Sequence, residues 1–130
     1  MFSKAPDALY QRILFANKHY FVLHQFRYGM KKRYLVLNLD ESQIGQPNLS
    51  VLTPDGRGTY TNDLKQADWE RVVLRGMEEI CDMTEPQRRA LRQMVEQRLS
   101  GADYLLVSNA LGTIWEGTAQ PGHLTPPDAP

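Results

Sequence analysis

The chain has 130 residues, 42% of them hydrophobic, and its 15 Lys and Arg balance its 15 Asp and Glu. This composition fits one globular domain with a single core, and the zero net charge argues against a protein whose whole surface is committed to one charged partner. The single Cys81 excludes an intramolecular disulfide, and no apolar run approaches the ~20 residues that span a bilayer. Because the N-terminus also lacks the apolar core of a signal peptide, we expect a cytoplasmic protein with no membrane partner.

The charges are segregated along the chain. Residues 1–39 carry seven Lys or Arg against one Asp, a net charge of +6, and residues 40–85 carry four against ten, a net of −6. Residues 86–100 follow with +3 and residues 101–130 with −3. We expect a charge dipole, part of which becomes internal salt bridges where the segments meet.

The N-terminal third predicts a helix followed by a hairpin. Apolar residues at helical spacing after Asp7, a possible N-cap, predict a helix over residues 7–18. The aromatic and β-branched residues of 20–28 favour a strand that turns near Gly29 into 33–39. The alternative extends the first helix through this segment and ends it at Gly29.

Strand 33–39 has the clearest alternation in the chain. Leu35, Leu37 and Leu39 share one face, and Tyr34, Val36 and Asn38 share the other. A loop over 40–48, a strand over 49–53, a turn at Pro54–Gly56 and a short strand over 58–61 follow.

The middle of the chain predicts a helix over residues 63–82, with Asn62 as its N-cap. Its main apolar stripe consists of Trp69, Val72, Val73, Gly76, Met77 and Ile80. A thinner stripe of Ala67, Leu74 and Cys81 lies on another side. A helix that is apolar on two sides is either buried twice or contacts a partner, which here is another protein or a second copy of the chain.

A capping box then predicts the start of a second helix. Thr84 is followed by Pro86 in the first turn and by Gln87 three residues after the cap. We expect this helix to run to about Ser100, with Gly101 ending it. Beyond it, residues 104–107 and 113–115 look like two short strands.

Together these elements predict a small single α+β domain over residues 1–116. Its antiparallel sheet (hairpin 20–39 plus short strands) packs against an N-terminal helix and a central helix pair. Residues 117–130 hold four of the eight prolines, which predicts a disordered tail.

The sequence offers little support for catalysis. His19 and His24 are five residues apart and would not share a face, and no third ligand stands at a metal-binding spacing. Carboxylates beside Cys81 disfavour its thiolate, and no serine has a nucleophile context. We expect no catalytic residue, no cofactor and no metal site.

The basic knot, which we define as Arg27, Lys31, Lys32 and Arg33, is the most suggestive feature. Four cations interleaved with Phe26, Tyr28 and Tyr34 suit single-stranded RNA or DNA, whose phosphates pair with cations and whose bases stack on rings. The competing interpretation is a hairpin tip whose exposed cations pair with the acidic segment 63–85.

We therefore expect a non-enzymatic binding or regulatory module of a microbe or its mobile elements, which docks on a protein. Whether the chain also forms a homo-oligomer stays open at this point. A nucleic-acid-binding protein is the first alternative, and an enzyme with a dispersed site is the second. The residues expected to contact the partner are Arg27, Tyr28, Lys31, Lys32, Arg33, Tyr34, Leu74, Arg88, Arg89 and Arg92.

Overall fold

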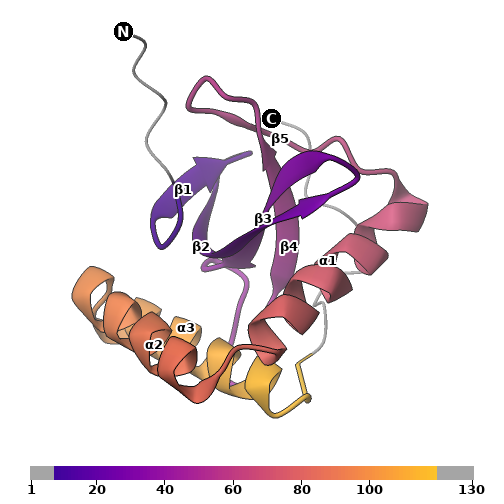
Figure 1. Cartoon of the computed structure of the whole chain (residues 1–130). Coiled ribbons are helices and arrows are strands. Elements are labelled where there is room, and N and C mark those ends of the chain that lie inside the picture. Colours follow the sequence, from indigo (N-terminus) through magenta and orange to yellow (C-terminus); the bar gives the residue numbers. More distant parts are fainter. Residues whose placement is uncertain (1–7, 120–130) are drawn as a thin grey trace, which may run out of the picture.

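In the part of the chain that the structure describes, a five-stranded antiparallel meander is followed by three helices (Figure 1). The strands are β1 (Arg12–Phe15), β2 (Lys18–Tyr28), β3 (Lys31–Asn38), β4 (Leu49–Pro54) and β5 (Tyr60–Thr61), in that order across the sheet. The helices are α1 (Gln66–Cys81), α2 (Glu85–Arg98) and α3 (Gly101–Trp115). This computed structural model describes residues 8–119. The predicted α+β domain with an antiparallel sheet is confirmed.

The β2–β3 hairpin is confirmed, and the helical alternative for residues 20–28 is wrong. Tyr28 pairs with Lys31 across a two-residue turn in which Gly29 and Met30 have φ of 60° and 71°. Two consecutive residues with positive φ make the type I′ turn, whose twist matches that of the flanking strands.

A bulge in β2 explains why its apolar pattern is hard to read from sequence. The register with β3 shifts between Val22 and His24. The extra residue, Leu23, changes the phase of the strand, so that Phe21 before it, Leu23 itself and Phe26 after it all face the same core.

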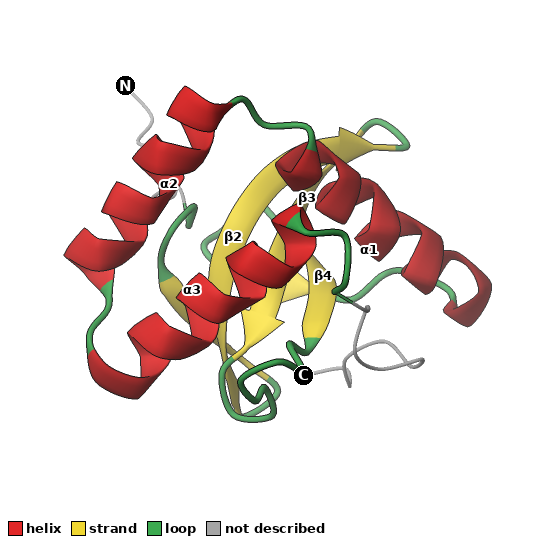
Figure 2. Ribbon diagram, turned by 90° about the horizontal axis from the view of Figure 1, so that it is seen from below, coloured by secondary structure: helices red, strands yellow, loops and turns green. Residues whose placement is uncertain are grey.

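Both faces of the sheet are buried. All three helices cover one face, where they form the main core with β2, β3 and β4 (Figure 2). The opposite face holds a smaller core with side chains from all five strands, including Phe15, Tyr20, Val36, Leu52 and Tyr60. The alternation predicted for 33–39 is thereby confirmed, since Leu35 and Leu37 lie in the first core and Val36 in the second.

The N-terminal helix predicted over 7–18 is wrong for the residues the structure describes. This segment forms β1, a two-residue turn and the start of β2. Ala16 and Asn17 have φ of 52° and 63°, which a right-handed helix cannot contain but a type I′ turn requires. The sheet gains an edge strand that pairs with β2 from Arg12↔Phe21 to Phe15↔Lys18.

Helix α1 has the predicted core stripe but begins later than expected. All six residues from Trp69 to Ile80 in that stripe are buried. The N-cap position is Lys65 and not Asn62, and no side chain caps it.

The capping box of α2 is confirmed in detail. The Gln87 N–H donates to Thr84 Oγ1 at 3.4 Å, and the Thr84 N–H donates to Gln87 Oε1 at 2.8 Å. The helix ends at Arg98 and not at Ser100; Leu91, Val95 and Leu99 are buried, and Met94 is half-buried.

The strands predicted over 104–107 and 113–115 are wrong, because both segments belong to α3. Val107, Ala110, Leu111 and Ile114 recur at helical spacing and pack into the main core. Residues Gly117–Ala119 turn back onto the end of α3, where the Thr118 and Ala119 N–H groups donate to the Thr113 carbonyl. The rest of the predicted tail, 120–130, lies outside the described residues.

Candidate partner-binding surface

Strand alternation divides the basic knot into two pairs. Lys31 and Arg33 both reach Asp63, in the segment between β5 and α1. Arg27 and Lys32 face each other across the hairpin and line a shallow hollow with Gln25 and Phe26. Adjacent residues of a strand point to opposite faces, so the four cations do not form one patch.

Asp63 is the anchor of the first pair. Its carboxylate accepts hydrogen bonds from Lys31 Nζ at 2.6 Å, from Thr53 Oγ1 at 2.9 Å and from Arg33. Burial raises the pKa of Asp63, but the hydrogen bonds from Lys31, Arg33 and Thr53 outweigh it and lower that pKa to about 2. The expectation that all four cations are exposed is wrong, since Arg33 is only 6% exposed.

Two of the three aromatic residues interleaved with the basic knot, Phe26 and Tyr34, serve the fold. Tyr34 is 3% exposed in the second core, where its ring packs against Tyr60 and lies 5.4 Å below Lys32 Nζ. Phe26 is buried against α1. Neither ring offers a free face on which a base could stack.

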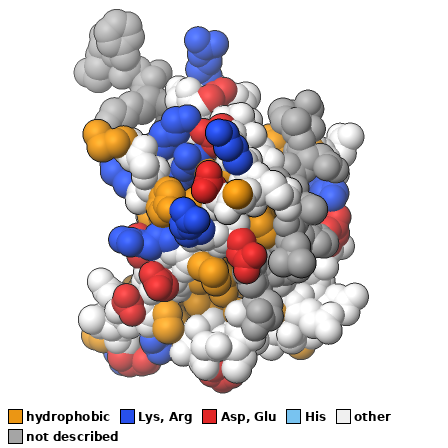
Figure 3. Space-filling view, turned by 90° about the vertical axis from the view of Figure 1, so that its right-hand side faces the viewer, with side chains coloured by type: hydrophobic (Ala, Val, Ile, Leu, Met, Phe, Trp, Pro, Cys, Tyr) orange, Lys and Arg blue, Asp and Glu red, His pale blue; other side chains and the backbone are white. Residues whose placement is uncertain are grey.

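Tyr28 and Leu74, far apart in sequence, come together at a groove between the end of β2 and α1. We call it the Leu74 groove; it measures about 270 Å³ and is lined by Tyr28, Arg71, Leu74, Arg75 and Glu78. Leu74 is 43% exposed and Tyr28 is half-buried. Figure 3 shows the side of the molecule that carries the hairpin and α1: Lys and Arg gather there, with Asp, Glu and apolar surface between them.

The arginines of this groove are held loosely. Arg71 lies 3.7 Å from Asp68 and Arg75 lies 3.4 Å from Glu79, and more than half of each arginine side chain is exposed. Such surface pairs contribute about 0–1 kcal/mol and exchange readily for another carboxylate. Sequence reasoning did not select Arg71 or Arg75, because their spacing matches that of any solvated helix face.

Met30 was also missed. It is 93% exposed and has a positive φ of 71°, a conformation that disfavours side chains other than Gly and Asn. The sequence signal was its position after Gly29 in a two-residue turn, where Gly or Asn is usual.

The arginines of α2 do not extend the knot. The guanidinium carbons of Arg88 and Arg92 lie 5.3 and 4.7 Å from the centroid of the Trp115 ring, and Arg88 also donates to the Cys81 carbonyl at 2.6 Å. Arg92 pairs with Glu85 at 3.6 Å, and Arg89 is exposed. This cluster joins the α1–α2 turn to the end of α3.

The second stripe of α1 is divided in the structure. Ala67 and Leu74 are exposed, and Cys81 is half-buried with a free thiol. Only Leu74 therefore presents a large apolar side chain to solvent on this stripe.

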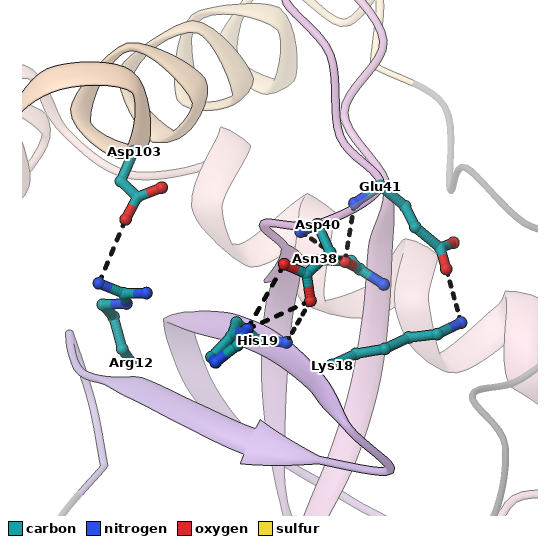
Figure 4. A network of polar contacts seen from close by, with 7 residues as sticks. All are labelled: Arg12, Lys18, His19, Asn38, Asp40, Glu41 and Asp103. Carbon is teal, nitrogen blue, oxygen red and sulfur yellow. Dashed lines mark hydrogen bonds and ion pairs between the residues drawn. The ribbon is translucent and has the colours of Figure 1, made fainter.

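A polar network fixes the loop after β3 (Figure 4). Asn38 Oδ1 accepts from the N–H groups of Asp40 and Glu41 at 2.9 and 3.0 Å. Asp40 in turn accepts from the His19 N–H at 2.8 Å, and Lys18 pairs with Glu41 at 2.6 Å. These contacts are structural, and they pin the acidic loop to the first residues of β2.

The two histidines of the sheet lie in separate pairs. His19 Nδ1 faces Asp40 at 3.3 Å, and His24 Nε2 faces Glu79 at 3.0 Å. Within residues 8–119, no group of three or more His, Cys, Asp or Glu is arranged to hold a metal ion. No helix in that range is both long and apolar enough to cross a bilayer.

Comparison of the chain with protein-family models, with curated proteins and with solved structures finds no match. Its function must therefore be inferred from its own residues.

Proposed function

We propose that this chain is a non-enzymatic binding or regulatory module of the cytoplasm, which docks on a protein partner through the Leu74 groove. The observation that carries this proposal is the exposure of Leu74 inside a hollow. Its helix already supplies the core from another stripe, so the fold does not require a leucine at this position. A single exposed leucine is common on protein surfaces, but here it shares a groove with Tyr28 and two arginines. Tyr and Arg are enriched at interfaces.

The groove also indicates the chemistry of the partner. An apolar side chain would pack between Tyr28 and Leu74, and carboxylates on the same segment would replace the weak internal partners of Arg71 and Arg75. The partner is accordingly an acidic protein segment with an apolar anchor.

Met30 supports the same surface. An exposed methionine at positive φ lowers stability by about 1 kcal/mol relative to glycine. Met30 is two residues from Tyr28, so its exposed apolar side chain can extend the docking surface. This role would explain why a residue that lowers stability stands there.

Nucleic acid is the competing ligand, and the pairing of Lys31 and Arg33 with Asp63 reduces the number of cations that could contact its phosphates. Only Arg27 and Lys32 of the knot lie outside the Asp63 cluster. Two phosphate contacts on a single strand give a slope of about −1.4 in log K against log salt, which corresponds to weak binding.

The experiment selects a phage-displayed random peptide library on the immobilised protein, then measures peptide binding by fluorescence anisotropy. We expect selected peptides to combine Asp or Glu with a large apolar residue. Leu74→Glu should raise Kd about tenfold or more, because a buried anchor dominates such an interface. Leu14→Glu, at a leucine of β1 that is 61% exposed and lies outside the Leu74 groove, is the matched control and should bind like wild type.

Two results would count against the proposal. One is selection of no peptide beyond those retained by an unrelated protein, and the other is unchanged binding by Leu74→Glu. In a parallel arm, labelled single-stranded RNA and DNA are titrated at two salt concentrations. Salt-dependent binding that is lost when Arg27 and Lys32 are both changed to Gln would assign the surface to nucleic acid instead.

A further inference from the structure

A second hollow lies on the outer face of α3 and shares no residue with the Leu74 groove. We call it the α3 groove; it measures about 390 Å³ and is lined by Ile44, Leu105, Ser108, Asn109, Gly112, Thr113 and Glu116. Leu105 and Ile44 are 57% and 58% exposed. The α3 residues of the lining recur every three or four positions, so they form one face, opposite the face buried in the core.

This face is complementary to itself in size. In an antiparallel pair of identical helices, residues at equal distances from the twofold axis face each other. An axis midway between Ser108 and Asn109 sets Leu105 of one copy against Gly112 of the other. A Cβ built on Gly112 meets nothing within 4 Å, so this position is open space in the single chain. Leu105, the largest side chain of the face, thus lies opposite Gly112, its smallest residue, at two positions related by the twofold axis.

The same axis makes the ends complementary in charge. Glu116 of one copy faces Gly101, the first residue of α3, in the other. The side chain of the N-cap residue Ser100 does not cap the helix, so first-turn N–H groups at this positive helix end can accept a carboxylate as partner. Asp103, the acidic residue of the first turn, is already paired with Arg12 at 3.4 Å (Figure 4) and opposes Glu116 less than a free carboxylate would.

The loop before β4 completes the groove. The Gly45 N–H donates to Asn109 Oδ1 at 2.6 Å, which holds the loop tip on α3 and sets Ile44 along its edge. A helix of 15 residues is about 22 Å long, so this face buries less than a standard interface of about 800 Å² per partner. The contact should be reversible.

We propose that α3 pairs antiparallel with α3 of a second copy, which makes the chain a reversible twofold dimer. The dimer leaves the Leu74 groove of each copy free of the α3 contact. This inference does not depend on the partner that occupies the Leu74 groove.

The test is sedimentation velocity of the full chain over a wide range of concentration, with thermal melts to check folding. Wild type should pass from monomer to dimer as concentration rises. Gly112→Leu fills the open position and Leu105→Ala removes the side chain that would enter it. Each should raise the dimer Kd about tenfold or more, without lowering the melting temperature of the monomer.

The double variant Leu105→Ala/Gly112→Leu exchanges the large and small positions. Since the axis relates these two positions, the pairing is restored with the roles reversed, and the dimer should return. Leu74→Glu should dimerise like wild type, which separates failure of this proposal from failure of the proposed function.

A wild type that stays monomeric at every concentration would overturn the proposal. So would a dimer that Gly112→Leu leaves unchanged, or a double variant no better than the single ones. A monomeric wild type that Gly112→Leu destabilises would also overturn it, and would indicate that the groove is filled by another part of the same chain.

Discussion

Asp63 determines which cations of the basic knot are available to a partner. It lies 30 residues from Arg33 and 32 from Lys31, and it binds both. Residues so distant in sequence meet only because β5 returns along β4 and delivers Asp63 beside β3. Because of this pairing, Lys31 and Arg33, which are two of the four cations of the basic knot, link the hairpin to the segment before α1.

Asp63 also makes stability depend on pH in a defined direction. Its pKa is about 2 in the folded chain against an ordinary value of 3.8, so the unfolded chain binds the proton more tightly. The stabilisation is complete above pH 4 and is lost as pH falls toward 2, and it amounts to on the order of 1 kcal/mol once solvent screening is allowed for. Asp63→Asn should therefore lower the melting temperature at pH 6.

Melts of both proteins between pH 2 and pH 6 measure this effect. The gap between wild type and Asp63→Asn should close at the acid end. A gap that stays constant across this range would show that the Asp63 charge does not contribute. Asp68→Asn is the control, because the Asp68 carboxylate is exposed and its ion pair with the exposed Arg71 is long, at 3.7 Å.

Part of the candidate surface could be predicted from the sequence. Tyr28 is predicted from the cations and aromatic residues of the hairpin and Leu74 from the second stripe of α1, and the structure brings the two into one groove. Arg33 and Tyr34 are predicted from the same hairpin composition as Tyr28 and are buried. A run of cations and aromatics in a strand divides between two faces, and only the tertiary structure decides which face is covered.

At the scale of elements, α1 approaches the sheet most closely at Gly76. A Cβ built there lies 2.9 Å from Phe26 Cε1 and 3.3 Å from Leu35 Cβ. A side chain at Gly76 would therefore force the Phe26 ring to shift, although an alanine would favour the helix by about 1 kcal/mol. This contact seats the same helix that carries the Leu74 groove.

Gly76→Ala should destabilise the fold by about 1–2 kcal/mol, because overpacking of a rigid core outweighs the gain in helix propensity. Chemical denaturation measures the difference. The same substitution in a Phe26→Leu background should cost less, since the ring that it meets is gone. Equal costs in the two backgrounds would place the strain elsewhere.

The elements that were predicted correctly are those whose signals are local. The capping box at Thr84, the alternation of 33–39 and the core stripe of α1 all hold. The helix predicted over residues 7–18 is wrong because the spacing of its apolar residues matches a helix by chance. Ala16 and Asn17 instead form the turn that brings the chain into β2. Helix α3 was not predicted because its β-branched residues and Asn109–Gly112 resemble two strands and a turn. Its buried residues nevertheless follow the helical period.

At the scale of the whole molecule, the segregated charges neutralise one another in part. Lys18 pairs with Glu41, His19 faces Asp40, and Lys31 and Arg33 bind Asp63. Each pair joins the basic segment 1–39 to the acidic segment 40–85. The segregation of charge along the sequence thus reflects, in part, which segments pair with each other in the folded chain.

If the chain is a dimer with two Leu74 grooves, it should bind a crowded surface more strongly than a sparse one. We expect wild type to dissociate about tenfold or more slowly from a surface densely coated with a selected peptide. Gly112→Leu, with the same groove but no dimer, should dissociate at one rate from both. Surface plasmon resonance at two coating densities measures this, and equal behaviour of the two proteins would exclude bivalent binding.

The order of the elements along the chain has a consequence during synthesis. Within residues 8–119, the five strands precede the three helices, so the sheet leaves the ribosome before the helices that cover its main-core face have been made. At about 5–20 residues per second, α3 follows β5 by several seconds. For that time Phe21, Leu23, Leu35 and Leu37 present an uncovered apolar face, the kind of surface that chaperones retain. A helix forms within about a microsecond once its residues emerge, so the pace of translation sets how long the nascent sheet stays exposed.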